Sequence, residues 1–440
     1  MRFYRRRKGR ERMEYFREEI LPCVSLTALK TDKFKTGCLT TYLLTQLQRE
    51  TAAENAVLPY VLRRGTTSMP ERKRIAAHLN DLYGAAVEPS VRKLGEIQAV
   101  GFYSAFPEDA YLPGETDVFG EIVRLMGELW LSPVTRGGLF LPEYVESERE
   151  KLTELIESVK NDKSSWAFKR LRENMCAFED YAVGAYGTAD EAENIHYVKL
   201  TKHYKELLGT SPMEIFYCGS RSGEEVAAAL REAFALLPRQ EINLDLGTDI
   251  RMNAVEEKPR YFTEEMDVAQ GVLAVGFRLG ECMEEPDKAA ISVFNALYGG
   301  GVSSKLFMNV REKLSLCYYA SSSADSIKGI LAVLSGIEFD KYDDALKEIL
   351  AQLDAVREGN ITPEELDAAR RTVAGALRTG ADSPYYLADF YLREAVEGED
   401  ASPDDMAELA ESVTADEVAA IARSVELDCV YFLRGEEEAE

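Results

Sequence analysis

An internal repeat is the sequence feature that most constrains the fold. The stretch Gly299–Tyr319, GGGVSSKLFMNVREKLSLCYY, has a fainter counterpart 234 residues earlier. At this offset Gly299 corresponds to Gly65 and Gly329 to Gly95, and the predicted helices and strands recur in the same order. A solenoid has short periods and at least three copies. Two long copies therefore predict a duplicated module.

The boundaries of the two modules follow from composition. A chain of 440 residues is too long for one ordinary core and suits two domains. We expect an N-terminal module at 21–236 and a C-terminal module at 265–435. The polar stretch 237–264 between them lacks periodic apolar residues and is predicted to be a linker. A basic arm at 1–20, expected to be disordered, and an acidic tail at 436–440 flank the modules.

The order of the predicted elements indicates the fold class. In the first half, strands are predicted near 86–93 and 96–105, and long helices follow near 116–131 and 142–160. Strands that are grouped, and do not alternate with helices, are typical of α+β layers. We predict an α+β fold with one mainly antiparallel sheet per module and helices packed on one face.

Charge and cysteine content narrow the function classes. The net charge of −25 disfavours nucleic acid as a partner and suits a basic or neutral peptide. No apolar run reaches the roughly 18–20 residues of a membrane helix. The seven cysteines are odd in number and form no C-x-x-C pair, which indicates reduced thiols in a cytoplasmic protein. The basic start, MRFYRRRKGRER, lacks the apolar run of a signal peptide and is either a solvated arm or a binder of an acidic partner.

The segment SSKLFMNVREKLSLCYY resembles the "LF..vRek.gL.Y" segment of the insulinase/pitrilysin-type zinc peptidases, the inverzincins. The phrases ALYGG and TPEELDAAR fit the same pattern, and the resemblance covers roughly 23–433. It implies the two-module fold of that family. The phrases LPYVLRRGT and KNDKSSWA are similar to those of a zinc-less bacterial type that occurs beside a zinc-bearing paralogue and is associated with elongation-factor-P modification.

The zinc motif of that family is degenerate in this chain. Active members carry H-x-x-E-H on a helix, where both histidines reach one Zn²⁺ and the glutamate polarises its water. The corresponding residues here, counted back from the following RGT, are Ala56, Pro59 and Tyr60. None offers an imidazole, carboxylate or thiol, and the proline removes a backbone donor inside the helix. The resemblance therefore implies no zinc in this chain.

No other metal site is predicted. The nearest match to the family's downstream glutamate ligand is Glu154, which is expected, with Glu148, Glu150 and Glu157, on a solvated helix face. The chain's three histidines are His78, His196 and His203. They form no H-x-x-E-H in either direction.

The resemblance assigns a role to Arg311 and Tyr318. In the family, such a pair on the second module faces the zinc across a chamber and hydrogen-bonds the peptide backbone and the developing oxyanion. The residue types suit this, since arginine stays charged and a phenol is a neutral donor. The competing interpretation is a surface ion pair of Arg311 with Glu312 and a packing tyrosine.

Three hypotheses follow. The chain could be the non-catalytic, substrate-binding subunit of a heteromeric zinc peptidase whose zinc-bearing paralogue supplies the metal and whose substrate is a peptide or protein. It could instead be a scaffold or peptide-binding protein with no role in proteolysis. An autonomous enzyme with an unrecognised site is the third possibility.

Overall fold

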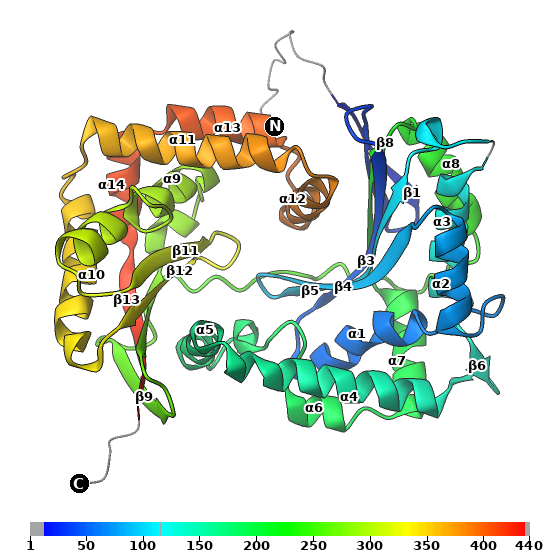
Figure 1. Cartoon of the computed structure of the whole chain (residues 1–440), viewed down its shortest axis with the longest axis horizontal. Helices are drawn as coiled ribbons and strands as arrows, with labels where there is room; N and C mark the ends of the chain where they lie inside the picture. Colours follow the sequence, from blue (N-terminus) through cyan, green and yellow to red (C-terminus); the bar gives the residue numbers. More distant parts are fainter. Residues whose placement is uncertain (1–12, 115, 436–440) are drawn as a thin grey trace.

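The computed structural model describes residues 13–114 and 116–435 and consists of two α+β halves (Figure 1). The expected acidic tail and the first twelve residues of the expected basic arm lie outside the described residues. In each half, helices cover the outer face of a sheet, and the two inner faces look toward each other. No helix in the described ranges is long and apolar enough to cross a membrane.

The N-terminal half contains a six-stranded sheet with the order β1-β2-β8-β3-β5-β4. Only β2 and β8 run parallel within it. Its strands are β1 Glu14–Leu21, β2 Val24–Lys30, β3 Thr36–Gln46, β4 Ala86–Leu94, β5 Ile97–Pro107 and β8 Met213–Gly219. A separate two-stranded ribbon consists of β6 Thr135–Arg136 and β7 Leu139–Phe140.

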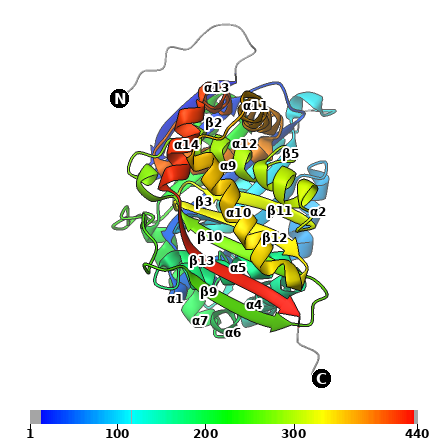
Figure 2. The ribbon, with the colours of Figure 1, turned by 90° about the vertical axis from the view of Figure 1, so that its left-hand side faces the viewer.

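The C-terminal half contains a five-stranded sheet with the order β11-β12-β10-β13-β9, in which only β9 and β13 run parallel (Figure 2). Its strands are β9 Arg260–Met266, β10 Gly271–Arg278, β11 Tyr319–Asp325, β12 Ile330–Ile337 and β13 Glu426–Gly435. Read from β4 and from β11, the two sheets share strand order and direction, and the first adds β1 at its far edge.

The remaining elements are helices. Those of the N-terminal half are α1 Arg49–Leu62, α2 Arg72–Asp81, α3 Val118–Leu131, α4 Pro142–Ser158, α5 Lys163–Met175, α6 Ala189–Glu193, α7 Tyr197–Thr210 and α8 Gly223–Ala233. Those of the C-terminal half are α9 Lys288–Tyr298, α10 Tyr342–Arg357, α11 Pro363–Gly380, α12 Pro384–Glu397, α13 Pro403–Ser412 and α14 Ala415–Ser424. Short turns are η1 Asp109–Tyr111, η2 Val159–Asn161, η3 Asp180–Ala182, η4 Gly280–Met283, the π-helix η5 Leu306–Lys313 and η6 Phe339–Lys341.

Each half has its own core between the sheet and the outer helices. In the N-terminal core Trp130 is fully buried, packs edge-on against Phe102 and donates to Thr41 Oγ1 at 2.9 Å. In the C-terminal core the rings of Phe294 and Tyr298 stack 5.8 Å apart. Two separate cores confirm the expectation of one sheet-and-helix layer pair per half.

The halves exchange one helix each across their inner faces (Figure 1). Helix α5 belongs to the N-terminal sequence but packs on the C-terminal sheet, where Trp166 and Leu171 join Ala274 in one apolar cluster. Helix α12 belongs to the C-terminal sequence but packs on the N-terminal sheet, with Tyr391 stacked on Phe216 at 5.7 Å. The sequence module boundaries therefore do not divide the packing units.

Two edge strands correct the expected boundaries. Strand β1 occupies residues assigned to a basic arm, and β9 begins inside the stretch assigned to the linker. Both are half-exposed and polar, since a sheet edge buries little of a strand, so neither shows the apolar signal of a central strand. The segment that resembles the family's "LF..vRek.gL.Y" pattern forms a π-helix over Leu306–Lys313.

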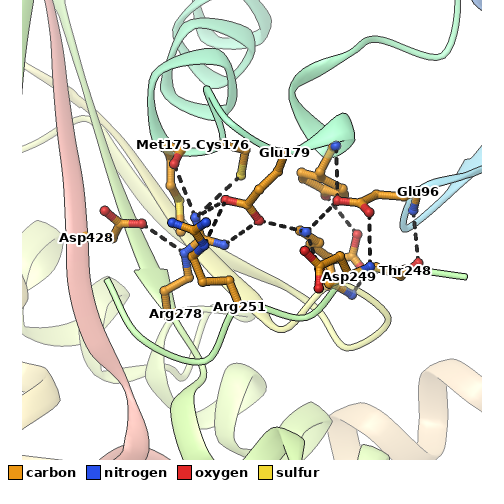
Figure 3. Close-up of polar contacts among 12 residues, drawn as sticks. Glu96, Met175, Cys176, Glu179, Thr248, Asp249, Arg251, Arg278 and Asp428 are labelled. Atoms are coloured by element: carbon orange, nitrogen blue, oxygen red, sulfur yellow. Dashed lines mark hydrogen bonds and ion pairs between the residues drawn. The ribbon is translucent and has the colours of Figure 1, made fainter. Parts of the chain in front are cut away.

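A buried charge network fixes the seam between the halves (Figure 3). Arg278 on β10 bonds to the carboxylates of Glu179 at 2.6 Å and Asp428 at 2.9 Å. Lys328, in the β11–β12 turn, contacts Glu179 at 2.7 Å and Glu96, in the β4–β5 turn, at 2.6 Å. Every charge in this set has a partner of opposite sign, as buried charges require.

Candidate functional site

The degenerate zinc positions lie on α1, which packs against β5, α4 and α7 in the N-terminal half. Ala56 and Tyr60 are one turn apart and share a helix face. Ala56 and Pro59 are buried, and Tyr60 is partly buried. Pro59 is accommodated inside the helix, where its carbonyl still accepts a hydrogen bond from the Arg63 backbone at 3.0 Å. The helix is thus intact but has lost its metal ligands.

These residues do not fit a zinc ion. Alanine and proline side chains have no ligand atom. Burial raises the pKa of Tyr60, and its neighbour Tyr186 and the charge of Glu148 raise it further, so this phenol stays protonated. In the parts of the chain that the structure describes, no three His, Cys, Asp or Glu side chains lie close enough together to hold a metal.

The glutamates of α4 differ from the expectation in one respect. Glu150, Glu154 and Glu157 are exposed, but the Glu148 side chain is only 6% exposed. Its carboxylate bonds to Arg64 at 2.9 Å and to Lys151 at 2.7 Å. The prediction of a solvated face is therefore wrong for Glu148.

The sequence contained a signal for this burial. Val145, Glu148 and Leu152 follow one another at three- and four-residue spacing, which places the glutamate inside an apolar helix stripe. Glu148, and not Glu154, is consequently the α4 carboxylate that lies near the degenerate motif.

His203 lies on α7 and His196 at its N-cap, whereas His78 lies on α2. His203 Nε2 is 2.6 Å from Asn55 Oδ1, and burial lowers the pKa of this histidine. His78 Nε2 lies 3.4 Å from a Glu121 oxygen. His196 caps α7, where its Nδ1 accepts from the Val198 backbone. Their contacts give each a structural role.

Arg311 lies on the π-helix η5, and π-helical turns are frequent at functional sites. Its side chain is 40% exposed. Its guanidinium lies 4.7 Å from the ring centre of Phe307 and 3.6 Å from Glu312. Its guanidinium makes no hydrogen bond within the described residues, so a ligand could use its donors.

Tyr318 lies immediately before β11 and is 58% exposed. Its hydroxyl donates to Glu338 Oε1 at 3.2 Å, and the charge of Glu338 raises the pKa of this phenol. Burial raises the pKa of the intervening Cys317, and the charge of Arg311 opposes that rise. Within the described ranges Arg311 and Tyr318 share no hydrogen bond, but both donors are accessible on one short segment.

The inner sheet edges offer little room for an added strand. Ser322 on β11 already donates its backbone N–H to the Gly299 carbonyl at 3.0 Å, so the glycine-rich stretch occupies the middle of that edge. Strand β4 forms the other edge and contains Pro89, which has no N–H to donate. A bound peptide would therefore depend on side-chain donors more than on strand pairing.

Comparison with known proteins agrees with the loss of the zinc ligands on α1. The family model described as "Peptidase M16 inactive domain" matches residues 194–373. The "Probable inactive metalloprotease YmfF" of Bacillus subtilis is 32% identical over 413 residues, covering 93% of this chain and 96% of that protein.

Solved structures agree in fold. A conserved protein from Enterococcus faecalis, 26% identical, superposes with a TM-score of 0.87 and covers 97% of this chain and all of that one. An M16 inactive domain from Pseudomonas fluorescens, 16% identical, gives a TM-score of 0.78, again covering 97% of this chain and 100% of that one. With a degenerate motif on α1 and these relatives, the chain belongs to the M16 peptidase family as a catalytically incomplete member.

Proposed function

We propose that this chain is the substrate-binding subunit of a heteromeric zinc peptidase that works in the cytoplasm. A paralogue with an intact H-x-x-E-H would supply the metal. One observation carries the proposal: the zinc-motif positions Ala56, Pro59 and Tyr60 on α1 offer no imidazole or carboxylate, but Arg311 and Tyr318 retain accessible donors. A chain that has substrate-binding residues but no zinc site can take part in cleavage only together with a partner that holds the zinc.

The two residues would act by binding and orienting the peptide. The guanidinium of Arg311 can donate two parallel hydrogen bonds to a terminal carboxylate, or a hydrogen bond to a single carbonyl oxygen. The Tyr318 hydroxyl, held by Glu338, can turn to a carbonyl that develops negative charge. The partner's zinc would polarise the attacking water. The negative net charge of this chain favours neutral or basic peptides.

The matching strand orders of the two sheets support an origin by gene duplication. After duplication, each half was free to lose residues that the other half or a partner supplied. The zinc motif in the first half and the Arg311/Tyr318 pair in the second would then have separate histories.

The experiment mixes this chain with a zinc-bearing paralogue and measures cleavage of a fluorescent peptide library. Complex formation is verified by size-exclusion chromatography. We expect Arg311→Ala and Tyr318→Phe to lower the cleavage rate about 100- to 1,000-fold, the range for removal of one oxyanion donor. Arg371→Ala, at an exposed position on α11, is the matched control. Unchanged rates in a verified complex would refute the assigned roles.

The second candidate is a scaffold or peptide-binding protein without a role in proteolysis. The contacts of Arg311 with Glu312 and of Tyr318 with Glu338, which are ordinary surface contacts, favour it. This candidate predicts peptide binding without cleavage in every partner mixture.

A further inference from the structure

A cavity of about 220 Å³ lies at the seam between α12 and the helices of the C-terminal half. Helices α9, α11 and α13 and the β11–β12 turn form the rest of its wall. It is separate from Arg311, Tyr318 and the degenerate zinc positions, none of which lines it.

The position of α12 makes this cavity a contact between packing units. Leu387 and Tyr391 attach α12 to the N-terminal sheet. The adjacent face of α12 presents Tyr386, Phe390 and Arg393 to the cavity at helical spacing. The facing helices α9 and α11 belong to the C-terminal core. A molecule in the cavity would therefore touch the C-terminal core helices and, on α12, a helix that packs on the N-terminal sheet.

The charges in the wall leave one cation unmatched. Arg393 makes no hydrogen bond or ion pair with any residue in the described ranges, and its charge only lowers the pKa of Tyr386, which burial raises. The three carboxylates in the wall are already engaged. Asp389 accepts from Arg92 at 2.9 Å, Glu397 from Lys288 at 3.1 Å, and Glu394 from the Ala401 backbone at 3.0 Å.

The rest of the wall is largely apolar. Val373 and Leu377 from α11, Phe390 from α12 and Met406 from α13 surround the space. A partly buried guanidinium without a partner is a bidentate donor for a carboxylate, and arginine is the side chain best suited to this recognition. The combination fits a ligand with an anionic head and a short apolar body.

We propose that this cavity binds a small aliphatic monocarboxylate, whose carboxylate pairs with Arg393 and whose hydrocarbon packs against Phe390 and Leu377. Because it would bridge α12 and α11, the ligand would stabilise the seam and restrict motion between the halves. The inference does not depend on a peptidase role.

The test uses the full chain and three probes of matched shape: 4-methylpentanoate, its neutral amide and 3-methylbutylamine. Binding is measured by isothermal calorimetry and by the shift in Tm. We expect 4-methylpentanoate to bind with a Kd on the order of 1 mM or tighter, as suits a ligand of this size. The amide should bind at least about tenfold more weakly, because it lacks the charge that pairs with arginine. Equal binding of acid and amide, or no binding of the acid at about 10 mM, overturns the proposal.

Two variants test the site. Arg393→Met keeps the length of the side chain, removes its charge and should weaken binding of the acid at least about tenfold. Arg371→Met, on the exposed side of α11, should bind as wild type does. Ser292→Phe places a ring in the cavity without changing a charge and should abolish binding of all probes. Undiminished binding by either cavity variant overturns the proposal, and Ser292→Phe keeps it testable if Arg393→Met does not fold.

Discussion

The ammonium of Lys328 lies 2.6 Å from the carboxylate of Glu96. The first residue is in the β11–β12 turn and the second in the β4–β5 turn, which occupy equivalent places in the two sheets. The Lys328 side chain is fully buried and that of Glu96 is 4% exposed. The two halves are thus joined through the equivalent hairpin turn of each sheet.

Removing the charge of Lys328 should destabilise the protein strongly. Lys328→Met leaves Glu96 and Glu179 buried without their shared cation, and breaking a buried pair in this way costs about 3–5 kcal/mol. Urea unfolding followed by circular dichroism measures the loss. Lys313→Met, on the exposed side of η5, is the control and should cost less than about 0.5 kcal/mol. Equal costs for the two variants would show that the network contributes nothing.

The same network should make the free energy of unfolding depend on pH in the acidic range. Burial alone would raise the pKa of Glu179, but hydrogen bonds from Arg278 and Lys328 outweigh it and hold the pKa below its ordinary value of 4.5. This carboxylate therefore stabilises the fold above pH 4.5, and the contribution is lost as the pH falls from there through the lowered folded-state pKa.

Glu179→Gln removes this titrating group. The difference in unfolding free energy between wild type and Glu179→Gln should be largest near neutral pH and should shrink as the pH falls below 4.5. Glu154→Gln, at an exposed position, should show no such trend. A difference that is constant with pH would mean that Glu179 is not held ionised by its partners.

Restoring the zinc motif tests the position of Glu148. The triple variant Ala56→His, Pro59→Glu, Tyr60→His recreates two imidazoles one turn apart on α1, and such a pair binds Zn²⁺ with one further ligand. We expect Glu148→Gln in this background to weaken zinc affinity about tenfold or more, because Glu148 is the buried carboxylate near position 60. Glu154→Gln should have no effect. Zinc titration against a chelating dye measures both, and the reverse ranking would identify Glu154 as the nearer ligand.

Helix α5 should contribute strongly to the contact between the halves. Trp166 is 9% exposed, packs among residues of the C-terminal sheet and donates to Glu264 at 3.1 Å. Trp166→Ala should lower the unfolding free energy by about 3–5 kcal/mol. Val198→Ala, at a position 43% exposed on α7, should change it by less than about 0.5 kcal/mol. A small loss at Trp166 would mean that α5 rests loosely on its sheet.

Local signals allowed much of the fold to be predicted. The two glycines paired by the repeat, Gly95 and Gly329, both lie in hairpin turns with positive φ, at 58° and 74°. Turns of this kind favour glycine, so the register of the repeat could be read from sequence. Strands β1 and β9 were missed because an edge strand buries too few residues to show an apolar pattern.

Long-range relationships could not be predicted in the same way. Helices α5 and α12 share the sequence Leu-Arg-Glu, at 171–173 and 392–394, yet α5 packs on the C-terminal sheet and α12 on the N-terminal sheet. An amphipathic pattern shows that one helix face is buried, but it does not say against which sheet. The lack of a partner for Arg393 could not be predicted either, since Asp389 and Glu397 both lie at helical ion-pair spacing from it.

Because α5 and α12 each pack on the sheet of the other half, the two halves should stay associated even when the chain between them is cut. A protease nick in the connecting stretch, for example beside Leu244, which is 67% exposed, would leave two fragments that still co-elute as one particle. Each fragment produced alone would expose the apolar sheet face that its counterpart's helix normally covers, so each would depend on the other for solubility.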